Sequence, residues 1–172
     1  MFILEFYYKK ILKKEVPYYA KYSLLLIIWK PIRKYLNVVI IPNIPFNFLR
    51  IFLYRLIGYK IGKNVFIGMK CYLDDVVPKN TIIENNVVIS YGCYFSCHGK
   101  NQTRTYIIIK KNAYLGMRCN IISGKEGITI GENSIIGAAS LVNKSVPDNV
   151  IAVGVPIRII KENKFIAKQD NN

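Results

Sequence analysis

The chain has 172 residues and a formal net charge of +15, from 25 Lys and Arg against 10 Asp and Glu. This length allows one main domain with a buried core and shorter flanking segments. The longest uncharged stretches near the N-terminus, 23–29 and 36–49, are too short to cross a bilayer. We therefore expect no transmembrane span and a cytoplasmic protein.

Residues 1–60 form a basic segment rich in aromatic and aliphatic side chains, with eleven Lys or Arg and two Glu. Within it, residues 48–57 have the pattern of a helix, with Asn47 as the expected N-cap and Gly58 just beyond the end. Such a segment suits an anionic membrane surface or an anionic lipid-linked substrate better than it suits base readout in nucleic acid. Two uses stay open and are compatible: packing on the next domain or a neighbouring subunit, and peripheral contact with the inner membrane face.

Residues 61–156 contain a repeat of six. Large apolar residues recur every sixth position in four triplets, and in eleven of the twelve hexads a small or β-branched residue follows four positions later. A helix needs a period near 3.6 and a flat strand a period of 2, whereas six fits one short strand and one turn per hexad. The repeat therefore predicts a parallel β-solenoid with three hexads in each triangular coil, anchored by Ile61, Ile67, Leu73, Ile83, Ile89, Phe95, Ile109, Leu115, Ile121, Ile130, Ile136 and Val142.

The extra residues between triplets should all leave the solenoid at one corner. The successive triplets are separated by steps of 10, 14 and 9 residues instead of six. The largest insertion, Gly99–Tyr106, directly follows His98, the only histidine of the chain. Insertions on one edge of a solenoid commonly build its functional face.

The four cysteines are predicted to be structural. Cys71, Cys93 and Cys119 occupy the small position of a hexad, and the sequence has no CxxC pair. Cys97 adjoins His98, but neighbours in sequence seldom reach the geometry that a thiolate nucleophile needs. One histidine cannot supply a three-histidine zinc site, so we expect no metal and no metal hydratase.

The closing stretch IGENSIIGAASLVNKSVPDNVIAVGVPIRIIKE, residues 130–162, in register with four coils, is similar to the hexapeptide-repeat acyltransferases. It most resembles their maltose, galactoside and polysaccharide O-acetyltransferases. The resemblance implies a left-handed parallel β-helix over residues 61–156 and a short C-terminal tail over 157–172. It also implies acetyl-CoA as co-substrate and a homotrimer with active sites between subunits.

The resemblance assigns roles to single residues. His98 matches the general base, and Gly116 with Met117 matches the backbone site that stabilises the oxyanion, although Met117 stands where galactoside acetyltransferases have a serine. The remaining matches are to acetyl-CoA: Ala138, Asn143 and Lys144 to the pantetheine, Arg158 and Lys161 to the phosphates.

Contacts to the acceptor are expected beside His98. Asp74 and Asp75 lie one coil earlier at the same corner, and Asp75 matches a sugar-binding aspartate of the galactoside enzymes. Carboxylates accept hydrogen bonds from sugar hydroxyls. Arg104 and Lys100, in the insertion after His98, would suit an anionic sugar or a diphosphate.

Together these features predict an acetyl-CoA-dependent O-acetyltransferase acting on a sugar hydroxyl in surface polysaccharide, capsule or lipopolysaccharide biosynthesis. The basic, apolar segment 1–60 favours a lipid-linked acceptor. Two alternatives stay open: an N-acetyltransferase of a nucleotide-linked amino sugar, and a non-catalytic solenoid that serves as a scaffold.

Overall fold

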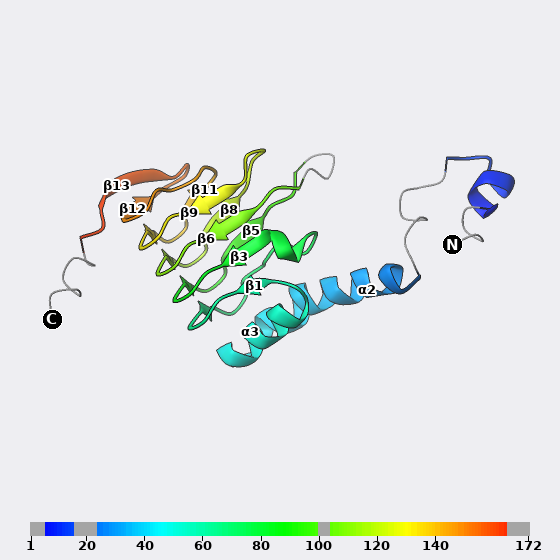
Figure 1. Ribbon diagram of the computed structural model, residues 1–172, viewed down its shortest axis with the longest axis horizontal. Helices are drawn as coiled ribbons and strands as arrows, with labels where there is room; N and C mark the ends of the chain where they lie inside the picture. The colour runs from blue at the N-terminus through cyan, green and yellow to red at the C-terminus, as the bar shows by residue number, and fades with distance from the viewer. Residues whose placement is uncertain (1–5, 16–23, 100–103, 165–172) are drawn as a thin grey trace. The chain divides into compact units, whose positions relative to one another are not determined.

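The computed structural model describes residues 6–15, 24–99 and 104–164, and the chain divides into two compact units, Met1–Leu36 and Asn37–Asn172. The second unit is a parallel β-solenoid of about four coils, stacked from β1 to β12 (Figure 1). The unit begins at Asn37, before the boundary at residue 60 that the sequence suggested. The reason is that residues 37–60 pack against the first coil.

Three sheets form the faces of the solenoid, and each coil passes through them in the order A, B, C. All pairings between coils are parallel and in register. Sheet A holds β1 (Lys60–Ile61), β3 (Thr81–Ile83), β6 (Ile107–Ile109) and β9 (Ile128–Ile130). Sheet B holds β2 (Phe66–Ile67), β4 (Val88–Ile89), β7 (Tyr114–Leu115), β10 (Ile135–Ile136), β12 (Val150–Val153) and β13 (Arg158–Glu162). Sheet C holds β5 (Tyr94–Ser96), β8 (Asn120–Ile122) and β11 (Leu141–Val142).

The predicted anchors make the core. Eleven of the twelve are at most 1% exposed, and only Ile61, at the start of the first coil, is partly accessible. Each anchor stacks on the equivalent residue one coil away, as in the pairs Ile83–Ile109 and Phe95–Ile121. Burial of these side chains is the main source of stability because a single coil has no second layer to cover its apolar face.

The corner between sheets A and B, here called the asparagine corner, is regular. An asparagine with positive φ occupies this corner in every coil, and each side-chain amide bonds to the next over 2.9–3.3 Å. Asparagine tolerates this left-handed conformation better than most residues, and its amide can both donate and accept. The ladder, which the hexad pattern did not reveal, consists of Asn64, Asn86, Asn112, Asn133 and Asn149.

The corner between sheets C and A, here called the insertion corner, carries all the extra residues, as predicted. Among the described residues it comprises 74–80, 97–99, 104–106, 123–127 and 143–145. The rule that a small residue is buried at the fifth position fails here, because Val77 is half-buried and Gly99 and Lys125 are exposed. After each insertion the chain re-enters the core with a different residue, namely Thr81, Ile107 and Ile128, all of which are fully buried.

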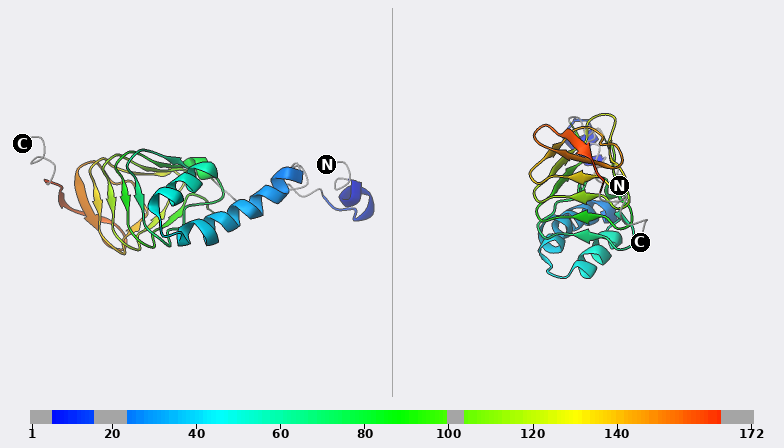
Figure 2. Two further views of the ribbon diagram at one scale, coloured as in Figure 1. Left: turned by 90° about the horizontal axis from the view of Figure 1, so that it is seen from below. Right: turned by 90° about the vertical axis from the view of Figure 1, so that its left-hand side faces the viewer.

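Helix α3 (Asn47–Leu56) closes the open end of the first coil, as Figure 2 shows. Arg50 is 2% exposed and its guanidinium donates to the Ile67 carbonyl from Nε at 3.0 Å and from Nη2 at 2.6 Å. Asn47 is not the predicted N-cap: its amide accepts from the Ile67 N–H and donates to the Val65 carbonyl, both at 3.0 Å. These side chains satisfy strand-edge groups that have no further coil to pair with.

The other end of the solenoid is closed by a reversal of the chain. Strand β13 turns back and pairs antiparallel with β12, so part of the expected C-terminal tail belongs to sheet B. Ile157 is 2% exposed and its N–H donates to the Leu141 carbonyl at 2.9 Å. The large residue after Pro156 is therefore accommodated in the core.

The first unit contains η1 (Tyr7–Ile11) and α2 (Leu24–Tyr35), followed at its junction with the second unit by the short helical turns η3 (Leu36–Ile40) and η4 (Ile41–Asn43). Trp29 and Ile32 on α2 are exposed, and Pro31 lies inside the helix. Among the described residues, none of the helices has the length and apolarity to span a membrane.

Candidate active site

The insertion corner brings together residues from the first and second coils. His98 follows β5, and Asp74 follows the strand segment of the first coil in which Tyr72 bridges to Tyr94. The Nδ1 atom of His98 lies 2.5 Å from Oδ2 of Asp74. A separation of 24 residues in the chain thus becomes a direct contact, because one coil with its insertion lies between them.

Asp74 is held rigidly. Its side chain is fully buried, Oδ1 accepts from the Val76 N–H at 2.9 Å, and Oδ2 accepts from the Cys97 N–H at 2.6 Å. Its backbone carbonyl accepts from the hydroxyl of Tyr59, a residue between α3 and β1, at 2.9 Å. Asp74, which is predicted to contact the acceptor, is thus fully buried, and its carboxylate faces His98.

This pairing favours one tautomer of His98. When Nδ1–H donates to the Asp74 carboxylate, Nε2 keeps a lone pair that faces away from Asp74. The histidine side chain is 37% exposed, whereas its partner is fully buried. The arrangement gives a fixed imidazole that is accessible from solvent and able to accept a proton from a bound hydroxyl.

Cys97 cannot serve as the nucleophile in this arrangement. The residue is 2% exposed. Burial, followed by the nearby Asp74 carboxylate, raises the pKa of its thiol to about 12. The other three cysteines are fully buried, and their thiols donate to carbonyls within the solenoid, which agrees with the structural role predicted from their positions.

Asp75 lies on the outer side of the same corner, next to two aromatic rings. The Tyr72 hydroxyl donates to the Asp75 carboxylate, and the Tyr72 ring stacks on Tyr94 with centroids 4.7 Å apart. Burial and then the hydrogen bond to Asp75 raise the pKa of Tyr72, so its hydroxyl remains a donor. The predicted acceptor residue thus stands beside an aromatic platform that no sequence motif indicated.

Further along this corner is an open pocket of about 490 Å³. Asn143 and Lys144 line it, together with Lys125 and Tyr106 from the two preceding coils. Two of the three predicted pantetheine residues, Asn143 and Lys144, therefore border a pocket with two cationic side chains, and Ala138 does not. Arg104 is exposed, and its backbone pairs with that of His98 in an isolated antiparallel β-bridge. Lys100 lies outside the described residues.

The predicted oxyanion residues lie at the third corner, between sheets B and C. A Cβ on Gly116 would come within 2.5 Å of the Ala138 nitrogen, but Gly68 is equally crowded, so close packing of coils alone explains the glycine. The Met117 side chain is 58% exposed. Within one chain, sheet C separates Gly116, Met117 and Ala138 from His98.

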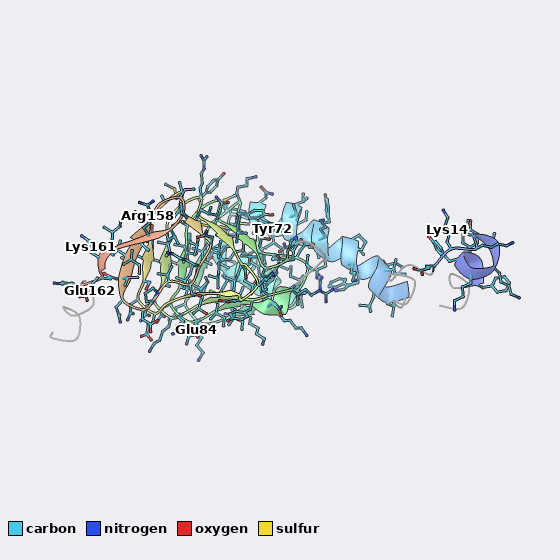
Figure 3. All side chains as sticks on the ribbon, turned by 90° about the horizontal axis from the view of Figure 1, so that it is seen from above. Lys14, Tyr72, Glu84, Arg158, Lys161 and Glu162 are labelled. Carbon is cyan, nitrogen blue, oxygen red and sulfur yellow. The ribbon has the colours of Figure 1, made fainter. Side chains whose placement is uncertain are left out.

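The predicted phosphate contacts sit on the antiparallel strand at the end of the solenoid. Arg158 pairs with Val153 and Lys161 with Ile151, and both side chains are exposed. Figure 3 shows them on β13, with Tyr72 far along the solenoid toward the opposite end. One chain therefore brings His98, Asp74, Asp75 and Arg104 together. The predicted coenzyme residues are divided: Asn143 and Lys144 lie further along the same corner, whereas the others lie at the third corner or on β13.

Comparison with known proteins places this geometry in context. The family described as "Hexapeptide repeat of succinyl-transferase" matches residues 59–96 and 106–144. Galactoside O-acetyltransferase of Escherichia coli is 33% identical over 118 residues, covering 60% of this chain and 57% of the relative. Serine acetyltransferase of Bacillus subtilis is 31% identical over 119 residues, covering 67% of this chain and 54% of the relative. The chain thus spans just over half the length of these curated relatives.

The solenoid also resembles a solved structure. The hexapeptide-repeat acetyltransferase of Vibrio cholerae, in complex with acetyl coenzyme A, superposes with a TM-score of 0.66 at 23% identity, covering 83% of this chain and 91% of that chain. At this identity the likeness concerns the fold. From its repeat, its parallel solenoid and these relatives, the chain belongs to the hexapeptide-repeat family.

Proposed function

We propose that this protein is an acetyl-CoA-dependent O-acetyltransferase that modifies a sugar hydroxyl of a surface polysaccharide, capsule or lipopolysaccharide precursor. The observation that carries the proposal is the contact of 2.5 Å between His98 and the buried Asp74 at the insertion corner. The galactoside relative supports a sugar acceptor. Among the described residues, no group of His, Cys, Asp and Glu has the arrangement of a metal site.

The reaction would proceed by direct transfer. Nε2 of His98 accepts the proton of the acceptor hydroxyl while its oxygen attacks the thioester carbonyl of acetyl-CoA. Asp74 stabilises the resulting imidazolium through Nδ1 and prevents the ring from turning. When the tetrahedral intermediate collapses, the carbon–sulfur bond breaks and the imidazolium returns the proton to the departing thiolate. The products are the acetyl ester and free coenzyme A, and no acetyl group becomes attached to the protein.

The site would be completed by a second copy of the chain. His98 and the Met117 N–H, the expected oxyanion donor, lie at opposite edges of sheet C, so one substrate cannot contact both within one chain. In a homotrimer the insertion corner of one subunit could face the third corner of its neighbour. Asp75 and the stacked rings of Tyr72 and Tyr94 would then hold the sugar beside the base.

Titration calorimetry with acetyl-CoA tests the coenzyme part. We expect micromolar affinity, and we expect the double variant Lys144→Ala, Arg158→Ala to lose it, whereas Lys79→Ala, an exposed lysine of the first coil, should bind normally. No heat of binding from a folded protein would favour a scaffold. Acetyl-CoA turnover with amino sugars or serine, but none with sugar hydroxyls, would support an acetyltransferase but reject the sugar hydroxyl as its acceptor.

Mixed oligomers test the shared site. Neither His98→Ala nor Arg158→Glu should be active alone, but the two chains expressed together should regain activity, because some sites then combine an intact His98 with an intact Arg158 from the other chain. Mixed oligomers without activity would show that both residues act within one chain. Sedimentation equilibrium gives the number of subunits.

A further inference from the structure

The end cap of the solenoid has two faces of different character. The inner face of α3 carries Arg50, Ile51 and Tyr54, which are at most 6% exposed and contact the first coil. The outer face carries Phe48, Phe52 and Leu56, which are 74%, 60% and 67% exposed. Residues four positions apart lie on the same side of a helix, so these three form one continuous apolar stripe.

The stripe continues beyond the helix. Phe46 is 59% exposed and its ring lies 5.9 Å from that of Phe48. Val38, Val39 and Ile40 are also at least 40% exposed. Apolar side chains gathered on one element in this way are unusual on the surface of a soluble monomer and indicate that something covers them.

The surroundings of the stripe are positively charged. From Asn37 to Leu73 the chain has five Lys or Arg and no Asp or Glu. Apart from the buried Arg50, these are the exposed residues Arg55, Lys60, Lys63 and Lys70. None of the four belongs to a salt bridge among the described residues, so their charges are not neutralised there.

From these observations we propose that the outer face of α3 docks the solenoid end-on against an anionic lipid membrane. In this arrangement the membrane takes up the side chains of Phe46, Phe48, Phe52 and Leu56. Arg55 and the surrounding lysines contact the lipid headgroups. Aromatic and aliphatic side chains would enter the interfacial region, and each nearby cation would be attracted to the anionic headgroups. The apolar stripe would thus meet an apolar environment, and the cations around it would meet the opposite charge.

Charge disfavours the other occupants that the protein itself offers. A second copy docking through the same face would place equal positive charges opposite each other. Residues 1–36 of the same chain carry eight Lys or Arg and two Glu, so they too are basic. An anionic membrane is the occupant with the opposite charge.

The docking would place the base near the membrane, an inference that rests on the proposed function. The connection from the cap to His98 is short: the Tyr59 hydroxyl bonds to the Asp74 carbonyl, and the Asp74 carboxylate bonds to His98. His98 is on the second coil, about 10 Å from the capped end at one strand spacing per coil. A saccharide linked to a lipid could reach it, while β13 and the predicted phosphate residues lie at the opposite end (Figure 3).

Vesicle flotation with the full chain tests the proposal. We expect the protein to float with vesicles of phosphatidylglycerol and phosphatidylcholine and much less with phosphatidylcholine alone, with binding that weakens as salt rises. The double variant Phe48→Ser, Phe52→Ser should lower the partition coefficient about tenfold or more, because two apolar anchors are lost. The matched control Tyr91→Ser, Tyr114→Ser removes two exposed rings from sheet B and its edge and should float normally.

Several results would overturn the proposal. Undiminished flotation of the Phe48, Phe52 variant would assign the membrane contact to residues 1–36. A wild-type assembly with twice the number of subunits found for the Phe48, Phe52 variant, without any flotation, would assign the face to a second copy. Absence of flotation in the wild type would reject the membrane. Since flotation needs no acetyl-CoA, a failure here is distinct from a failure of the coenzyme titration.

Discussion

The two corners that flank sheet A differ in regularity. The asparagine corner repeats one conformation and one hydrogen-bonding group in every coil, whereas the insertion corner has a different length and sequence in each. Yet both connect the same strands to the same core. The comparison indicates that the repeated corner keeps the coils in register, and that the irregular corner is free to carry chemistry because the fold does not depend on its details.

The sharpest test of this division is the loss of the histidine. His98→Ala should lower kcat/KM for acetyl transfer by about 10²- to 10⁴-fold, because only the proton acceptor is removed. The melting temperature should change little, since the ring is exposed at the corner edge. Steady-state kinetics with calorimetric melting measures both. Near-normal turnover by the variant would reject His98 as the base.

Asp74 should have the next largest effect, because it acts through His98. Asp74→Asn keeps the size of the side chain but replaces a group that only accepts hydrogen bonds with an amide that also donates them. The imidazole should then lose its fixed orientation, and kcat should fall about 10²-fold. KM for acetyl-CoA should stay unchanged, which a general loss of structure would not allow. Asp75→Asn is the matched control at the adjacent residue: it should raise KM for the acceptor and spare kcat.

The asparagine corner should respond in the opposite way, with a change in stability and none in activity. Asn112→Ala removes amide bonds to Asn86 and Asn133 and places alanine at positive φ, which should cost about 1–2 kcal/mol of unfolding free energy. Asn112→Gly loses the same bonds but tolerates the conformation, so it should be the milder variant. Differential scanning calorimetry ranks the two. Equal melting temperatures for all three proteins would show that the ladder is not stabilising.

The sequence could predict the regular part of the molecule because regularity leaves a period. Every anchor from Ile67 to Val142 points inward as the hexads required, and the insertions leave at one corner. The helix over 48–57 appears within one residue of its expected limits, at Asn47–Leu56. Each of these elements depends on local patterns that repeat or on residues close together in the chain.

The parts that the sequence did not reveal are contacts across coils. Asp74 was assigned to the acceptor because its corner was known but the direction of its side chain was not. An inward turn of one residue at the start of an insertion decides whether a carboxylate faces solvent or His98. The buried Arg50 and the bond from Tyr59 to Asp74 were missed for a similar reason, since the cap contacts the solenoid through side chains without a recurring spacing.

The smallest expected effect concerns the cysteine at the insertion corner. Cys97 lies next to His98, but its thiol points into the core, and a pKa of about 12 leaves it protonated at pH 8. Thiolates, not thiols, react with iodoacetamide, and the thiolate fraction grows only as pH rises toward the pKa. Native protein should therefore lose no acetyl transfer activity under conditions that label Ser145→Cys, an exposed position of the same corner. Mass spectrometry locates the label. Loss of activity together with modification of Cys97 would show that this residue takes part in the reaction.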